Sequence, residues 1–197
     1  SFLRQIWCLN GHSAASLGTL GLESELASTP LGHTTPDPAV IHAHLARLSA
    51  DGVEHVAIEA SSHGLDQHRM DGVRVHMAGF TNFSRDHLDY HGSLENYLTA
   101  KGRLFGEVMP AGGIAVLNRN SCCFPTLVKI CRDREHQVFQ YGRHVPDDQS
   151  GDRNINLLDA NPTSTGLRLS VGYGRHTANF EVCLLGTFQA ENLLCAI

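Results

Sequence analysis

The hydrophobic pattern of the first three quarters of the chain alternates between helix-like and strand-like segments. Apolar residues recur at helical spacing in residues 38–52, which predicts a helix there. Short apolar runs bounded by glycine or polar residues predict buried strands. Because helices and strands alternate, the pattern predicts an α/β fold with a mostly parallel sheet flanked by helices. Further predicted helices cover residues 1–11, 93–109 and 126–134, and predicted strands cover 14–21, 55–60, 74–82, 112–118 and 136–142.

The pattern changes at Asn154, after which apolar and polar residues alternate with a period of two. That period, together with the turn sequences NPTSTG and GYGR, predicts antiparallel hairpins that form a small subsheet joined to the main one. The final GTFQAENLLCAI predicts another helix. Residues 25–38 are predicted to form a loop, because three prolines there prevent regular strand pairing.

Both ends of the chain carry helical patterns without helix boundaries. SFLRQIWCLNG has no N-cap before it, and GTFQAENLLCAI stops in the middle of its pattern. A length of 197 residues suits one domain. We therefore expect one domain of a longer protein, or a chain with missing flanks.

Composition and charge exclude several classes of protein. A hydrophobic content of 42% with 18% charged residues is ordinary for a globular protein. The net charge of −5 and the lack of a Lys/Arg cluster argue against nucleic acid or an anionic membrane surface as the main partner. No apolar run approaches the roughly 20 residues that span a bilayer, and no signal peptide opens the sequence. We therefore expect a cytoplasmic protein whose six cysteines are buried free thiols.

Polar residues follow two of the predicted strands. Glu59 ends the strand HVAIEA, and Asn82 ends RVHMAGFTN. In an open α/β sheet, ligands bind beyond the carboxyl ends of the strands, so both loops are expected at one edge. A carboxylate next to Ser61, Ser62 and His63 could hold a divalent cation. Equally, Glu59 could cap a neighbouring helix.

The loop SRDHLDYHG contains Asp86, His87, Asp89 and His91. Alternating acids and histidines suggest metal or phosphate chemistry, but their spacing matches no zinc signature. The alternative is a solvated turn whose aspartates cap the helix that begins at Ser93.

Lys101 is the first lysine of the chain and lies on an apolar helix face. A single lysine in this setting usually extends to water. If it lies buried near a cation site, its positive charge must be neutralised. Reaction of the neutral amine with carbon dioxide would turn it into a carbamate, which is an anionic oxygen ligand.

The segment HTTPDP places two hydroxyl groups in a proline-stiffened loop just before a helix N-terminus. That arrangement could contact an anion or a sugar. The alternative is simple N-capping by Thr35 or Asp37.

Four strings, in their order and spacing, resemble the central domain of the Mur ligases: HTTPDP, EASSHGLDQHR, GFTNFSRDHLDYHGSLENYLTAKGRLF and GTFQAENLLCAI. The resemblance covers nearly the whole chain, and within the family it points to members that add the third amino acid of the peptidoglycan precursor. SSHGL and DHLDYHG are specific strings. Folylpolyglutamate synthetases share the fold and the lysine, but they are not expected to carry TTPDP with SSHGLDQHR.

The resemblance implies roles for individual positions. Lys101 matches the family's carbamylated lysine, an N6-carboxylysine, and Glu59 and His87 match its Mg²⁺ ligands. These three are the implied catalytic residues. Asn192 matches an asparagine that contacts the adenine of ATP. The positions that match contacts to the UDP-muramoyl-dipeptide are Thr34, Thr35, Ser61, Gln67 and Arg69.

The implied reaction uses ATP to phosphorylate the terminal carboxylate of UDP-N-acetylmuramoyl-L-alanyl-D-glutamate. The amine of the incoming amino acid, meso-diaminopimelate or lysine, then attacks the acyl phosphate, and the tetrahedral intermediate expels phosphate to leave the amide. Every step moves negative charge, so Mg²⁺ and a positioned arginine would supply electrostatic stabilisation. The implied partners are therefore ATP, the UDP-N-acetylmuramoyl-dipeptide and an amino acid, without nucleic acid or membrane insertion.

The sequence also departs from the family pattern. The glycine-rich GTNGKT phosphate loop is not found, and SFLRQIW resembles the helix that follows that loop. The uridine-binding and amino-acid-selecting domains would also lie outside these residues. His33 and Gln189 replace asparagines that are common in the family, and NRNS stands where an acidic pair is usual. We therefore expect these 197 residues alone to lack ligase activity.

Two other classes of function compete with the ligase interpretation. One is a non-catalytic binding or scaffold domain that keeps the fold but has lost nucleotide chemistry. The other is a metal-dependent hydrolase that uses the histidine loop.

Overall fold

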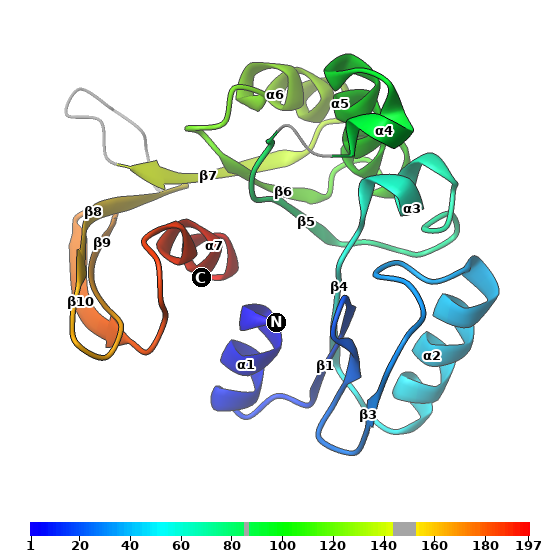
Figure 1. Cartoon of the computed structure of the whole chain (residues 1–197), viewed down its shortest axis with the longest axis horizontal. Coiled ribbons are helices and arrows are strands. Elements are labelled where there is room, and N and C mark those ends of the chain that lie inside the picture. Colours follow the sequence, from blue (N-terminus) through cyan, green and yellow to red (C-terminus); the bar gives the residue numbers. More distant parts are fainter. Residues whose placement is uncertain (85–86, 144–152) are drawn as a thin grey trace. The chain divides into compact units, whose positions relative to one another are not determined.

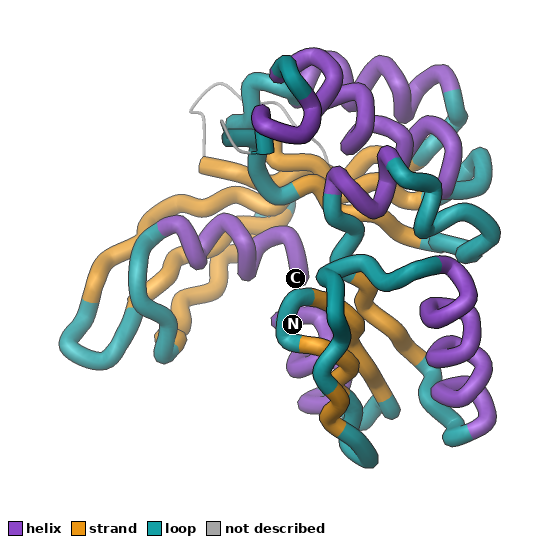
Figure 2. The backbone as a smooth tube through the Cα atoms, turned by 45° about the vertical axis from the view of Figure 1, so that its right-hand side comes forward, coloured by secondary structure: helices purple, strands orange, loops and turns teal. Residues whose placement is uncertain are grey.

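The strands form two sheets, and each sheet is flanked by helices (Figures 1 and 2). The structure is a computed structural model that describes residues 1–84, 87–143 and 153–197. Two compact units are present: Ser1–Val75 with Arg85–Val108, and His76–Ser84 with Met109–Ile197. The predicted α/β class is confirmed, with the strands distributed over two sheets.

The first unit is built on a four-stranded sheet. Its elements are α1 (Phe2–Leu9), β1 (Ala14–Gly18), β2 (Gly21–Glu23), β3 (Ser28–Thr29), α2 (Pro38–Ala50), β4 (His55–Ile58), α3 (Ser62–Asp66), α4 (Leu88–His91), α5 (Leu94–Arg103) and the π-helical turn η1 (Leu104–Val108). The strand order is β3-β2-β1-β4. β1 pairs in parallel with β4 and antiparallel with β2, which puts the carboxyl ends of β1 and β4 side by side.

Two apolar clusters hold the first unit together. One buries Ala15, Leu17 and Leu22 of the sheet against Leu48 of α2. The other buries Ile41 of α2 with residues of α3 and the turn after it. Figure 1 shows α1 and α2 on opposite faces of this sheet.

The first unit differs from the predicted elements at three points. Ser1 is an N-cap for α1, because its Oγ accepts a hydrogen bond of 3.2 Å from the Arg4 backbone N–H, so the expectation of an uncapped helix was wrong. β3 forms within the predicted loop, since its two residues precede the first proline. The segment Leu88–His91, predicted as loop, is the short helix α4.

The second unit contains a six-stranded sheet. Its elements are β5 (Met77–Phe80), β6 (Ile114–Asn118), α6 (Phe124–Asp133), β7 (Gln137–Arg143), β8 (Asn154–Pro162), β9 (Leu167–Tyr173), β10 (His176–Val182) and α7 (Phe188–Ala196). β5 to β8 pair in parallel, and β8 to β10 pair antiparallel, which confirms the predicted subsheet. α6 and α7 lie on opposite faces of this sheet (Figure 1).

The cysteines follow the expectation of burial only in part. Cys123 and Cys131 are buried, whereas Cys122 and Cys183 are exposed, so for these two the expectation was wrong. Cys122 lies in the turn before α6, and Cys183 lies just beyond β10, where the chain leaves the sheet. None of the helices in the described parts of the chain is both long and apolar enough to cross a membrane.

Candidate active site

Glu59 lies directly after β4, at the carboxyl end of the parallel β1–β4 pair. Its Oε2 accepts hydrogen bonds from Thr19, from the backbone N–H at 3.0 Å and from Oγ1 at 3.1 Å. Thr19 Oγ1 also lies 3.0 Å from Thr34 Oγ1. No residue in the described parts of the chain donates to Glu59 Oε1. Glu59 therefore closes the turn after β1 rather than capping a helix.

Gly18, the last residue of β1, permits this position of Glu59. A Cβ at Gly18 would lie 2.6 Å from Glu59 Oε2, closer than van der Waals contact allows. Glycine therefore lets the carboxylate lie across the end of the neighbouring strand.

Thr35 joins the loop before α2 to the start of α3. Its Oγ1 donates to the Glu59 carbonyl at 2.8 Å and accepts from the Ser61 backbone N–H at 2.9 Å, and the side chain is buried. A Cβ at Gly64 would lie 2.6 Å from Thr35 Cβ, so the approach of the loop to α3 requires glycine. Asp37 occupies the N-cap position of α2 without a side-chain hydrogen bond. The hydroxyl of Thr35 thus organises the site and does not cap α2.

The predicted substrate contacts beyond Thr35 also lie in one hydrogen-bonded network. Arg69 donates to the Thr35 carbonyl at 2.9 Å and to Gln67 Oε1 at 2.6 Å. Gln67 Nε2 donates to the Tyr90 hydroxyl at 3.0 Å. Ser61 caps α3, because its Oγ accepts from the Gly64 N–H at 3.0 Å. The structure therefore brings Thr35, Ser61, Gln67 and Arg69 together.

Arg69 also lies near a carboxylate. Its Nε lies 3.7 Å from Asp37 Oδ1, and its side chain is only 18% exposed. These contacts fix the orientation of the Arg69 guanidinium. Its planar set of N–H donors suits an anionic or carbonyl ligand.

A cluster of histidine and tyrosine rings surrounds α4. The His63 ring centroid lies 4.1 Å from that of Tyr90, 5.0 Å from that of His87 and 5.4 Å from that of His91. His91 is buried, and its Nε2 lies 3.0 Å from Ser62 Oγ. The interpretation of this loop as a solvated turn therefore fails at His91.

Electrostatics at this cluster favour a neutral His91. Burial is the largest cause that lowers the pKa of His91, and Asp66 opposes that effect. Electrostatic interactions with His63, His87 and Lys101 lower the pKa of His91 further.

The other residues of this loop have separate positions. Asp89 lies exposed in α4, and Asp86 lies outside the described residues. Ser93, not an aspartate, caps α5 through a hydrogen bond of 3.1 Å from the Asn96 N–H. Lys101 Nζ lies 5.1 Å from the centroid of the Tyr97 ring, in a cation–π contact.

The predicted Mg²⁺ ligands fit the ion unequally. In residues 1–84, 87–143 and 153–197, neither Glu59 nor His87 belongs to a group of three His, Cys, Asp or Glu donor atoms within 4.8 Å of one another. The Glu59 carboxylate, with the Thr19 hydroxyl at 3.1 Å and the Thr34 hydroxyl next to that of Thr19, offers the oxygen donors that Mg²⁺ prefers. The Glu59 side of the site thus fits the ion, and the complete ligand set stays a prediction.

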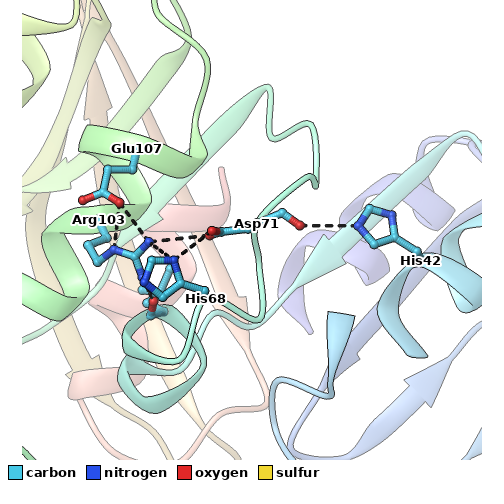
Figure 3. Close-up of polar contacts among 6 residues, drawn as sticks. His42, His68, Asp71, Arg103 and Glu107 are labelled. Carbon is cyan, nitrogen blue, oxygen red and sulfur yellow. Dashed lines mark hydrogen bonds and ion pairs between the residues drawn. The ribbon is translucent and has the colours of Figure 1, made fainter. Parts of the chain in front are cut away.

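Arg103 of α5 anchors the turn that follows α3 (Figure 3). Its side chain is 12% exposed and donates to Glu107 Oε2 at 2.9 Å and to the Leu65 carbonyl. Its NH2 group lies 2.8 Å from His68 Nδ1 and 3.6 Å from Asp71 Oδ1.

The turn held by Arg103 carries Gln67 and Arg69, so Arg103 positions the hydrogen-bonded network of these two residues with Thr35. Sequence reasoning missed Arg103, Thr19 and Tyr90. The strings GRLF and DYHG contained two of them, but helical spacing gave no sign of their partners.

A second polar cluster occupies the carboxyl ends of β5, β6 and β7 in the second unit. Buried Asn118 donates to the Thr81 carbonyl and to Glu191 Oε2, both at 3.0 Å. Asn192, which follows Glu191 in α7, donates to Gln189 Oε1 at 3.1 Å. Asn192 therefore belongs to the second unit, whereas the other predicted site residues belong to the first. Glu59 follows β4 of the first unit, and Asn82 follows β5 of the second. The expectation that these two loops open at one edge therefore stays a prediction.

The chain belongs to the Mur ligase middle domain family, whose sequence profile matches residues 1–197. A protein from Caulobacter vibrioides named UDP-N-acetylmuramoyl-L-alanyl-D-glutamate--2,6-diaminopimelate ligase is 44% identical over 99% of this chain and 40% of its own length. One of the same name from Rhizobium meliloti is 45% identical over 100% of this chain and 39% of its own.

A solved structure with that name agrees in fold. It has a TM-score of 0.86 and 29% identity, and the match covers 99% of this chain and 38% of the solved one. The resemblance stated from the sequence is thereby confirmed at the level of the family. The chain spans about two fifths of the length of the curated relatives it matches.

Proposed function

We propose that these 197 residues are the middle domain of an ATP-dependent ligase that joins 2,6-diaminopimelate to UDP-N-acetylmuramoyl-L-alanyl-D-glutamate in peptidoglycan synthesis. The observation that carries this proposal is the network linking Thr35, Ser61, Gln67 and Arg69 beside Glu59. The diaminopimelate specificity rests on the names of the relatives at 44% and 45% identity. The reaction belongs in the cytoplasm, where its nucleotide substrates are available.

The proposed roles follow from the donors at each position. Arg69, with Gln67, orients an anionic group of the UDP-muramoyl-dipeptide, and the hydroxyls of Thr34, Thr35 and Ser61 bind its polar groups. Asn192 contacts the adenine of ATP. Fixing the terminal carboxylate against the γ-phosphate lowers the entropic cost of the phosphoryl transfer.

Glu59 and His87, with a carbamate on Lys101, would hold Mg²⁺. When bound, Mg²⁺ would supply electrostatic stabilisation to the phosphates. Lys101 lies over the Tyr97 ring, and Tyr97 in turn contacts the rings of His87 and His91.

Other segments are needed for the whole reaction. We infer that the phosphate loop, the uridine-binding domain and the domain that selects the amino acid lie outside these 197 residues, since the relatives are more than twice as long. We therefore expect no turnover by the 197 residues alone.

The test measures phosphate release by the full-length protein that is encoded by the reading frame containing this chain. Release should require ATP, Mg²⁺, the UDP-muramoyl-dipeptide and diaminopimelate together, and L-lysine should not replace diaminopimelate. Arg69→Met should raise the KM for the nucleotide precursor at least tenfold, whereas His176→Gln, at an exposed position in β10, should change nothing. Release that is independent of the amino acid would refute the ligase proposal.

The proposed carbamate on Lys101 can be tested separately by NMR. Protein equilibrated with ¹³C-bicarbonate should show a carbamate carbon by NMR, and Lys101→Met should lack it. An identical spectrum for both proteins would remove Lys101 from the proposed metal site.

The second candidate is a binding or scaffold domain without nucleotide chemistry. The replacement of family asparagines by His33 and Gln189 favours it. Calorimetric binding of the UDP-muramoyl-dipeptide without any phosphate release by the complete protein would support this candidate against the ligase.

A further inference from the structure

Three side chains of types that can bind metal ions meet at the amino ends of β1 and β4, the edge of the first sheet opposite to Glu59. They are His12, Glu54 and His55. β1 and β4 pair with Ala14 opposite His55, so His12 lies two residues before one strand and Glu54 directly before the other. Neither the family resemblance nor the proposed ligase reaction uses these residues.

The backbone fixes the two segments that carry the three side chains. The Ser13 carbonyl accepts hydrogen bonds from the N–H groups of both Glu54 and His55, at 3.0 and 3.2 Å. The His12 N–H donates to the Trp7 carbonyl at 3.0 Å at the end of α1. The ligand positions are therefore set by strand pairing and a helix end rather than by a flexible loop.

The donor atoms are spaced as a metal ion requires. His12 Nδ1 lies 3.4 Å from Glu54 Oε2, and all three donor atoms lie within 4.8 Å of one another. In a tetrahedral zinc site with bonds of about 2.0–2.1 Å, neighbouring ligand atoms lie about 3.3–3.4 Å apart. The His12–Glu54 distance thus already equals one edge of such a tetrahedron, and the His55 donor atom lies within 4.8 Å of both.

The alternative is an ordinary surface ion pair between His12 and Glu54, whose side chains are 48% and 60% exposed. Such a pair explains two of the three residues. It does not explain the third donor, His55, whose ring stands nearly perpendicular to that of His12 at a centroid distance of 5.0 Å.

We propose that His12, Glu54 and His55 form a binding site for Zn²⁺ or a related first-row divalent ion. Two imidazoles and a carboxylate suit these ions, whereas Mg²⁺ prefers oxygen ligands and water. Because the donors are partly exposed, water completes the coordination. The ion would link the end of α1 to the start of β4 and so stabilise the first unit in proportion to its concentration.

The structure also provides a reporter for this site. Trp7 is the single tryptophan of the chain, and its ring stacks on His55 with centroids 5.0 Å apart and planes at 24°. A paramagnetic ion held by His55 lies close enough to quench Trp7 fluorescence, whereas an ion held elsewhere on the chain has much less effect.

The experiment titrates the 197-residue chain with Co²⁺ and follows Trp7 fluorescence and the visible absorption of the metal. One equivalent should quench Trp7, Zn²⁺ should restore the signal by competition, and millimolar Mg²⁺ should not. His12→Gln and Glu54→Gln, both at exposed positions, should each weaken binding at least tenfold, with unchanged far-UV circular dichroism. The matched control His176→Gln should bind as the wild type does.

Two results would overturn the proposal. One is Co²⁺ binding that leaves Trp7 unquenched, which would place the ion elsewhere. The other is equal affinity of the wild type, His12→Gln and Glu54→Gln. Neither result affects the proposed ligase function, because these residues lie at the opposite edge of the sheet from Glu59.

Discussion

Replacing Thr35 by valine changes the side chain very little in size, but it should lower the free energy of unfolding of the first unit substantially. Valine has nearly the shape of threonine, so packing is retained and only the hydroxyl is lost. That hydroxyl donates to the Glu59 carbonyl and accepts from the Ser61 N–H, and Thr35 is 1% exposed. Thr35→Val therefore leaves one carbonyl and one N–H without their partner.

The expected magnitude follows from the cost of an unpaired buried group, which is about 1–3 kcal/mol. Two such groups, both only partly buried, give an expected loss of about 2–4 kcal/mol in the free energy of unfolding. Thr35→Ser keeps the hydroxyl and loses one methyl group, so its expected loss is about 1 kcal/mol.

Thr34 offers a matched control. Its Oγ1 contacts only Thr19 Oγ1 among the hydrogen bonds of the described residues, and it is half-buried. Thr34→Val should change the free energy of unfolding by less than about 0.5 kcal/mol.

Urea unfolding followed by Trp7 fluorescence measures these differences in the first unit, where the single tryptophan lies. The order of stability should be wild type, Thr34→Val, Thr35→Ser and then Thr35→Val. Equal midpoints for Thr34→Val and Thr35→Val would show that the Thr35 hydroxyl does not hold the loop to α3.

The remaining predictions concern both units. Tyr141→Phe should cost about 1–2 kcal/mol by circular dichroism in urea, because the buried hydroxyl donates to the Phe80 carbonyl at 3.0 Å; an unchanged midpoint would contradict this. Arg103→Met should cost about 2–3 kcal/mol, with Arg103→Lys in between, since methionine leaves the Leu65 carbonyl unpaired. Burial raises the pKa of Cys131 from 9.0 to about 11. The unfolded chain therefore loses this proton first, and stability should fall by about 2 kcal/mol between pH 9 and pH 11. Cys131→Ala should lack that part of the alkaline decline in pH-dependent urea unfolding. A thiol reagent should modify exposed Cys122 and Cys183 before Cys131, as mass spectrometry of partly labelled peptides can check.

Local patterns predicted much of the fold. The hairpins of β8 to β10 follow from period-two alternation and the turns NPTSTG and GYGR, which are features of neighbouring residues. Glu59 was placed at a strand end for the same reason, since an apolar run stops there.

Contacts between distant segments were not predictable in this way. Thr19 and Glu59 are 40 residues apart, and only the parallel pairing of β1 with β4 brings them together. The His12, Glu54 and His55 group depends on the same pairing, because His12 lies more than 40 residues before the other two. The burial of His91 was missed because DHLDYHG looks hydrophilic, whereas its histidine turns inward to Ser62.

The discontinuity of the first unit has a consequence for its synthesis. Its residues come from two stretches of the chain, which are separated by the segment that contains β5. During translation, α5 and Arg103 leave the ribosome only after β5, so the turn with Gln67 and Arg69 stays unanchored until residue 108 has emerged. A truncation after residue 75 would therefore not yield a separable domain, and limited proteolysis should release no stable fragment that ends there.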